Sequence, residues 1–91
     1  MDPATRLEAA PAVVTREVGG EMMLVDLDSG TYFGLNDVGG RLWQLLDEGQ
    51  SLGDACAQLL NEFEVERDQL ERDITTLVGE LVERKLLVSA A

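Results

Sequence analysis

The sequence predicts an α+β domain in which a three-stranded antiparallel sheet is followed by a three-helix bundle. Over residues 13–35, short runs of β-favouring residues are separated by turn signals at Gly19-Gly20 and at residues 28–30, as in a β-meander. Over residues 36–85, apolar residues instead recur at helical spacing in three stretches. Amphipathic helices bury their apolar stripes against the sheet and one another, so we expect one shared core and a winged-helix-like shape.

Length and composition are those of one small folded domain. The chain has 91 residues, of which 45% are hydrophobic and 27% charged. Residues 1–12 contain two prolines and show no periodicity, so we expect a flexible N-terminal arm there and a single domain over residues 13–88. The first residues lack a basic start and an apolar core, so no secretory signal is indicated and the cytoplasm is the expected location.

The strands are expected at residues 13–18, 21–27 and 31–35. The third of these, Thr31-Tyr32-Phe33-Gly34-Leu35, is rich in aromatic and β-favouring residues and follows a turn signal. Alternation gives both faces of the second strand apolar side chains. We expect Met22, Leu24 and Tyr32 to share one face. That face is either ordinary exposed apolar surface or is covered by a partner or a second copy.

The three helices are predicted from their caps and their apolar stripes. Asn36 is a good N-cap for the first, and Ser51-x-x-Asp54 approximates a capping box for the second. Cys56 falls within the stripe of the second helix and is expected to be a buried core residue. The third helix is expected over residues 67–85, with its stripe formed by Leu70, Ile74, Leu77 and Leu81, widened by Val78 and Val82.

Charge and residue usage exclude several classes of function. The net charge is −11, so the chain should be repelled by nucleic acids and anionic membranes, whereas a basic peptide would be attracted. There is no histidine and only one cysteine, so the usual zinc sets and the Ser-His or Cys-His nucleophile pairs cannot form. No calcium-loop pattern is present. We therefore expect no enzymatic activity, no catalytic residues, no metal and no cofactor.

Glycines occur at positions 34, 39 and 40, around the junction between the third strand and the first helix. The lysine that follows the glycines of a phosphate-binding loop is absent, and so is the G-x-G-x-x-G order. A steric role is the better interpretation, because glycine in a helix costs about 1 kcal/mol relative to alanine. We expect another backbone to approach the first turn of the helix, and expect Gly34 to leave room for a partner's backbone.

Several short motifs occur in a characteristic order. Tyr32-Phe33-x-Leu35-Asn36 is followed by a small residue at Gly39 or Gly40, then by Leu42-Trp43-x-Leu45-Leu46, Asp73-Ile74-x-x-Leu77, Leu81 and Leu86-Leu87-Val88. Over residues 13–88 the chain thereby resembles the PqqD-like family, or RiPP recognition elements, and among them the free-standing members of lasso-peptide clusters. These domains bind the leader segment of a ribosomal precursor peptide and present it to modifying or cleaving enzymes. The pair of glycines is a mild departure from the family pattern.

The resemblance implies a binding site. A leader would add as an extended strand beside the third strand and pack into a groove between that strand and the last helix. The backbone of Tyr32, Phe33, Gly34 and Leu35 would set its register. The floor would be formed by Leu77, Val78 and Leu81, and the rim by Asp73 and Glu80. The partners implied are the precursor's leader peptide, a leader peptidase and a cyclase or other modifying enzyme.

Two other functions remain open from the residues. One is a structural or regulatory adaptor that pairs with another protein, or forms a homodimer, through the Met22, Leu24 and Tyr32 face. The other is a winged-helix DNA binder. Against it, the second and third helices are predominantly acidic, whereas a recognition helix is basic.

Overall fold

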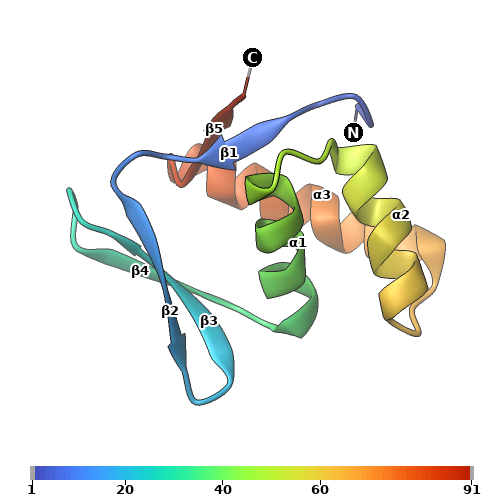
Figure 1. Cartoon of the computed structure of the whole chain (residues 1–91), viewed down its shortest axis with the longest axis horizontal. Coiled ribbons are helices and arrows are strands. Elements are labelled where there is room, and N and C mark those ends of the chain that lie inside the picture. Colours follow the sequence, from blue (N-terminus) through green and yellow to red (C-terminus); the bar gives the residue numbers. More distant parts are fainter. Residues whose placement is uncertain (1, 91) are drawn as a thin grey trace.

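The structure is a computed structural model that describes residues 2–90 (Figure 1). It confirms the α+β class, with the predicted meander followed by three helices. The elements in order are β1 (Leu7–Ala9), β2 (Val13–Val18), β3 (Glu21–Asp26), β4 (Thr31–Leu35), α1 (Asp37–Asp47), α2 (Leu52–Glu62), α3 (Arg67–Glu83) and β5 (Leu87–Ser89).

The main sheet is antiparallel, with strand order β2-β3-β4. The turn between β2 and β3 has two residues, Gly19 and Gly20, with φ of 60° and 85°. Positive φ at both positions is the type I′ geometry that matches the twist of paired strands, and glycine adopts it without steric cost. This turn sets the register: Val18 pairs with Glu21, and the pairing runs back to Val13 and Asp26.

The two faces of the sheet differ from the sequence-based expectation at one residue. Leu24 pairs with Phe33, and Leu24 is fully buried, so these two residues share the inner face with Met22 and Leu35. Tyr32 pairs with Val25 on the outer face and is 67% exposed. The expected face of Met22, Leu24 and Tyr32 therefore does not exist. Alternation along β4 correctly predicted which of its residues share a face. It does not show how β4 pairs with β3, and that pairing decides which residues of the two strands lie on the same face.

The expected flexible arm is wrong over much of its length. β1 pairs antiparallel with β5, with Leu7 opposite Ser89 and Leu7 buried in the core. Before β1, Arg6 forms an isolated bridge with Ser51, and its guanidinium donates to the carbonyl of Gly49. In Figure 1 the N-terminal segment runs along the top of the helices beside β5. The two ends of the chain therefore form a second, two-stranded sheet; Met1 and Ala91 lie outside the described residues.

The predicted helix caps are confirmed. The side-chain oxygen of Asn36 accepts from the N–H of Gly39 at 2.8 Å, and that of Ser51 accepts from the N–H of Asp54 at 3.2 Å. The third helix ends at Glu83, two residues before the predicted end, and Lys85 has a φ of 61°. The core between helices and sheet is predominantly leucine, with Ile74, Trp43, Ala55 and Cys56.

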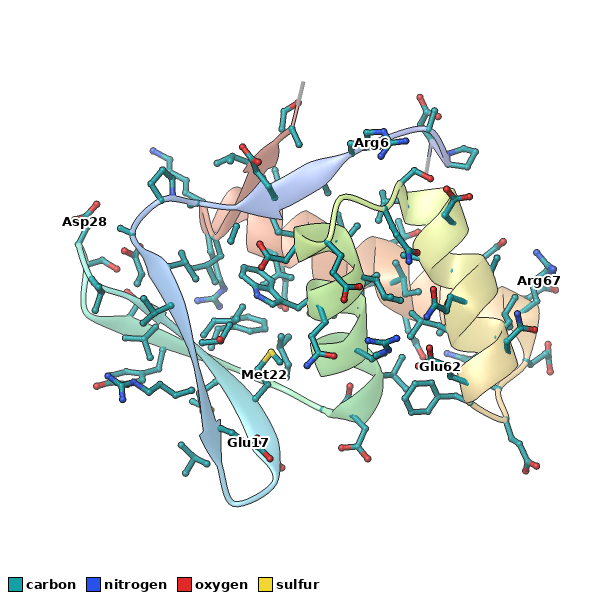
Figure 2. All side chains as sticks on the ribbon, in the orientation of Figure 1. Arg6, Glu17, Met22, Asp28, Glu62 and Arg67 are labelled. Atoms are coloured by element: carbon teal, nitrogen blue, oxygen red, sulfur yellow. The ribbon has the colours of Figure 1, made fainter. Side chains whose placement is uncertain are left out.

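The glycines of α1 allow close packing, as expected, but against side chains rather than a backbone. A Cβ at Gly40 would lie 3.4 Å from the Cβ of Met22, and one at Gly39 would lie 3.2 Å from a methyl group of Leu77. Figure 2 shows Met22 between the sheet and α1. The two glycines thus bring the start of α1 against β3 on one side and α3 on the other.

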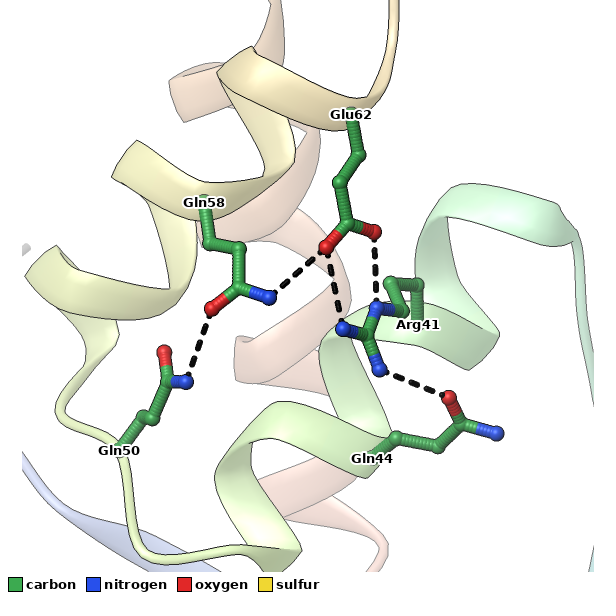
Figure 3. A network of polar contacts seen from close by, with 5 residues as sticks. All are labelled: Arg41, Gln44, Gln50, Gln58 and Glu62. Carbon is green, nitrogen blue, oxygen red and sulfur yellow. Dashed lines mark hydrogen bonds and ion pairs between the residues drawn. The ribbon is translucent and has the colours of Figure 1, made fainter.

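A polar network joins α1 to α2 across their exposed sides (Figure 3). The guanidinium of Arg41 donates to both carboxylate oxygens of Glu62, at 2.8 and 3.0 Å, and to the side-chain oxygen of Gln44 at 3.2 Å. Gln58 also donates to Glu62, at 2.8 Å, and accepts from Gln50 at 2.9 Å. Bidentate geometry makes this the best-defined ion pair among the described residues.

This network makes stability depend on pH. Hydrogen bonds, first from Arg41 and then from Gln58, hold the pKa of Glu62 below its ordinary value of 4.5. As the pH falls, Glu62 is protonated in the unfolded chain before it is protonated in the folded chain. The stabilisation that the ionised Glu62 gives the fold is therefore fully present above pH 4.5 and is lost as the pH falls through the lowered pKa of the folded chain. Thermal melts of wild type and Glu62→Gln should therefore differ most near neutral pH and converge in acid. A difference that does not change with pH would contradict this role.

Cys56 is buried, as predicted, with 6% of its surface exposed. Burial, with the nearby Glu71 carboxylate, raises the pKa of its thiol. Both effects lower its reactivity, since the thiolate is the nucleophile. A thiol reagent should label the native protein more than about tenfold more slowly than the denatured protein. Equal rates would contradict a core position.

In the part of the chain that the structure describes, no helix has both the length and the apolar character needed to cross a bilayer.

Candidate functional site

An apolar groove of about 460 Å³ lies between β4, the first turns of α1 and one side of α3. Its volume is within the range of protein sites that take a small ligand or a few side chains. The groove is lined by Phe33, Gly34, Leu35, Asn36, Val38, Gly39, Leu42, Val65, Gln69, Leu70, Asp73, Ile74, Leu77 and Glu80.

In the floor of the groove, a side chain of α3 packs against the first turn of α1. Leu77 is half-buried and packs against Gly39. Beneath it, Leu42, Leu70 and Ile74 belong to the buried core. A Cβ at position 39 would lie 3.2 Å from a methyl group of Leu77, so a larger residue there would displace Leu77 by a few tenths of an ångström. The helix-breaking tendency of glycine is therefore tolerated at a position that shapes the site.

Charged and polar groups lie along α3 at the rim. The carboxylate of Asp73 accepts from the side-chain amide of Gln69 at 2.8 Å. Glu80 is exposed about two turns further along the helix. At the end of α3, the guanidinium of Arg84 lies over the ring of Phe33, 5.3 Å from its centre. The rim is acidic along the helix, with one cation at the Phe33 end.

The edge of β4 that does not contact β3 has no strand partner among residues 2–90. Because a two-residue hairpin turn makes Val18 and Glu21 a hydrogen-bonded pair, Met22 and Leu24 turn their backbone groups toward β4. Their partners are Leu35 and Phe33. The alternate residues of β4, Tyr32 and Gly34, therefore turn their N–H and C=O groups toward the free edge. The apolar groove therefore lies beside the unpaired backbone groups of β4.

Comparison with known families agrees with this geometry. The family model of coenzyme PQQ synthesis protein D (PqqD) matches residues 21–87, which include the main part of the sheet and all three helices. The chain belongs to the PqqD family. No curated protein matches it significantly.

Two solved structures are similar to this PqqD-family chain over nearly its whole length. One is TbiB1 in complex with the TbiA(beta) leader peptide, with 36% sequence identity, a TM-score of 0.80, and coverage of 92% of this chain and 98% of that chain. The other is lasso peptide synthetase B1 complexed with the leader peptide, with 35% identity, a TM-score of 0.81, and coverage of 91% and 98%.

The fold brings together six of the nine residues expected at the site of this PqqD-family domain. Phe33, Gly34, Leu35, Asp73, Leu77 and Glu80 all line the groove. Leu81 does not, because it is 1% exposed and belongs to the core. Val78 packs partly against the core without lining the groove. The side chain of Tyr32 points to the outer face, although its backbone faces the free edge.

Gly34 has a different role from the one expected. A Cβ at this position would meet the sulfur of Met23 at 3.3 Å, and Met23 is its partner in β3. The missing side chain therefore lies on the outer face of the sheet. Gly34 lines the groove through its backbone, and its lack of a side chain does not open the path of a neighbouring strand.

Several lining residues were missed from the sequence. Asn36, Val38 and Gly39 start α1, and Val65 and Gln69 lie at the other end of the groove, around the start of α3. The spacing of Gln69, Asp73 and Glu80 places them on the side of α3 that also carries Leu77. This spacing is the sequence pattern from which Gln69 could have been predicted as a residue of the groove. Among residues 2–90, no group of three or more potential ligands could hold a metal ion.

Proposed function

We propose that this chain binds the leader segment of a ribosomally synthesised precursor peptide, which adds as a strand to β4. It acts by binding, and delivers the precursor to a leader peptidase and to a cyclase or other modifying enzyme in the cytoplasm, where such precursors are made. The observation that carries the proposal is the unpaired edge of β4 beside an apolar groove. The two similar structures, both bound to leader peptides, support it.

The groove and the edge would contribute differently to binding. The backbone groups of Tyr32 and Gly34 would pair with any extended chain and so provide affinity and register. Because side chains of an added strand alternate, every second leader residue would point into the groove, onto Leu77 and Leu35. Burying one apolar side chain there contributes about 1.5–3 kcal/mol. Selection among peptides would therefore come from the groove.

Titration of the leader tests the proposal. The leader peptide of this chain's own precursor, labelled with a fluorophore, should bind with a Kd of about 1 µM or tighter by fluorescence anisotropy. A scrambled peptide of the same composition is the control, because it keeps charge and length. Equal affinity for the scrambled peptide, or no binding of the leader, would contradict the proposal.

The acidic rim should have a minor effect on affinity. Asp73 and Glu80 are exposed, and exposed ion pairs contribute about 0–1 kcal/mol. Asp73→Asn and Glu80→Gln should therefore each weaken leader binding less than about fivefold, and should reduce its dependence on salt. The measurement is the leader Kd at low and high salt. A larger loss that persists in high salt would place a buried charge contact at the rim instead.

The DNA-binding alternative conflicts with the charges of the helices. Seven acidic residues lie on or just before α3: Glu64, Glu66, Asp68, Glu71, Asp73, Glu80 and Glu83. No salt-sensitive retention of duplex DNA is therefore expected at moderate ionic strength. An electrophoretic shift at sub-micromolar protein that weakens with added salt would contradict this.

A further inference from the structure

A small cavity of about 320 Å³ lies beside the β3–β4 turn, where α3 ends. Figure 2 labels Asp28 in this turn. The cavity is next to the groove, because Arg84 lines the cavity and its guanidinium also lies over the ring of Phe33, which lines the groove. Two adjacent cations are therefore found at the Phe33 end of the groove. The cavity is lined by Asp26, Ser29, Thr31, Arg84, Lys85 and Leu86.

These two cations have no carboxylate partner among residues 2–90. Neither Arg84 nor Lys85 forms an ion pair there. The carboxylate of Asp26, the acidic residue that lines the cavity, instead accepts from the N–H of Asp28 at 3.0 Å. The two hydroxyls of the cavity are bonded to each other at 2.7 Å. In a chain with 18 acidic and 7 basic residues, pairing of these cations within the chain would be the expected arrangement. They are instead left available to an external carboxylate.

Lys85 occupies a position that favours glycine. It has a φ of 61°, and after it the N–H of Leu86 donates to the carbonyl of Leu81 at 2.8 Å. This bond closes a Schellman motif, in which the left-handed residue is ordinarily glycine because a Cβ is disfavoured there. A cation at the end of a helix complements the helix dipole, but the neighbouring Arg84 already provides one. A lysine kept at this steric cost indicates a function for its side chain.

A leader strand beside β4 would bring side chains to these cations. The leader residue opposite Phe33 would point to the inner face, beside the ring of Phe33 and the guanidinium over it. Backbone pairing repeats every two residues, so it fixes which leader residues face the groove but permits a shift by two. A charged contact at one end of the groove would select one register. The charged residues that line the groove itself, Asp73 and Glu80, are acidic, so a carboxylate is attracted to the Phe33 end.

We propose that Arg84 and Lys85 form a carboxylate-binding subsite, which takes an Asp or Glu side chain of the leader and thereby sets the register of the leader on β4. This inference rests on the proposed function. Hydrogen bonds between cations and carboxylates are stronger than those between neutral groups, and a guanidinium can bind a carboxylate through two parallel bonds. Because neighbours on one face of a strand are two residues apart, the acidic residue would stand about two or four residues from the apolar residue that packs on Leu35 and Leu77.

Three variants of the subsite and one control test the inference. Arg84→Gln and Lys85→Gln each remove a charge and keep a long polar side chain. Lys85→Gly also removes the left-handed side chain, so its melting temperature should rise while its leader affinity falls. Arg16→Gln is the matched control, because Arg16 is an exposed cation on β2 that does not line the groove and has no ion pair among residues 2–90.

Leader affinity is measured by fluorescence anisotropy at low and high salt. Arg84→Gln and Lys85→Gln should each weaken binding about threefold to tenfold at low salt, and the double variant at least about tenfold, with smaller losses at high salt. Arg16→Gln should stay within about twofold of wild type. Leaders in which one acidic residue at a time is changed to its amide identify the acceptor. One of them should bind wild type more weakly by a similar factor, yet bind the double variant as the unchanged leader does.

Other results contradict the inference in separable ways. If the subsite variants bind the leader like wild type, or no more weakly than Arg16→Gln, the cations do not contact the leader. If they lose affinity but every amide change in the leader has an independent effect, the cations contact the leader's backbone and not a carboxylate. If Lys85→Gly lowers the melting temperature, Lys85 is a structural residue of the turn. If wild type does not bind the leader at all, the proposed function itself is wrong.

Discussion

Gly34→Pro is expected to reduce leader affinity by about tenfold to a hundredfold, whereas Gly34→Ala should bind the leader within about threefold of wild type. The pairing of β3 with β4 turns the N–H of Gly34 toward the free edge, so it is not needed within the sheet. Proline removes this donor, worth about 1 kcal/mol, and its ring obstructs an approaching strand.

Alanine provides the matched control, because it keeps the N–H and adds only a Cβ on the outer face, against the flexible end of Met23. Proline is tolerated in edge strands where its nitrogen faces outward, so both variants should fold. The measurements are leader anisotropy and a thermal melt for each variant. If folded Gly34→Pro binds like wild type, the leader does not pair with β4 at this position.

Leu77→Glu is expected to weaken leader binding by about thirtyfold or more, equivalent to about 2 kcal/mol. Leu77 forms the half-buried floor of the groove, and a carboxylate there would keep water where a leader side chain should pack. Val82→Glu on the same helix adds the same charge outside the groove and should leave leader affinity within about twofold of wild type.

Stability separates a damaged groove from a damaged fold. Leu77→Glu should cost about 1–3 kcal/mol of unfolding free energy, because Leu77 also contacts Gly39. Binding is therefore measured well below the melting temperature of the variant. If Leu77→Glu and Val82→Glu weaken binding equally, the effect comes from net charge, and the groove is not the leader site.

The order of β2, β3, β4 and the three helices could be predicted because each of these elements has a strong local signal. The glycine turns, the caps at Asn36 and Ser51 and the leucine stripes are properties of neighbouring residues, and all were confirmed. β1 could not be predicted in this way. It has three residues, too few for a periodic pattern, and it is held by pairing with β5 at the other end of the chain.

Part of the candidate site could also be predicted from local sequence patterns. Phe33 and Leu35 lie on one face by simple alternation, and Leu77 lies on the apolar side of a helix. The burial of each side chain on α3 depends on how the helix packs against α1 and β4, which the sequence of α3 alone does not show. Leu81 belongs to the same apolar stripe of α3 as Leu77 but is buried in the core. Gln69 and Val65, by contrast, line the groove.

The position of Tyr32 shows a further limit of the sequence. Its side chain was expected beside Met22 and Leu24, but one residue of register between β3 and β4 moves a side chain to the other face. That register follows from the length of the turn at residues 27–30, and no residue type in β4 encodes it. The result is an exposed tyrosine on the outer face of the sheet whose backbone still faces the free edge.

Residue-resolved amide exchange, followed by NMR with and without saturating leader, tests the central claim most directly. In the free chain, the N–H groups of Tyr32 and Gly34 face the open edge of β4 and should exchange rapidly, whereas that of Phe33 is paired with β3 and should be protected. Addition of the leader should slow exchange at Tyr32 and Gly34 by about tenfold or more and change Phe33 less. If saturating leader leaves exchange at Tyr32 and Gly34 unchanged, strand addition to β4 is wrong.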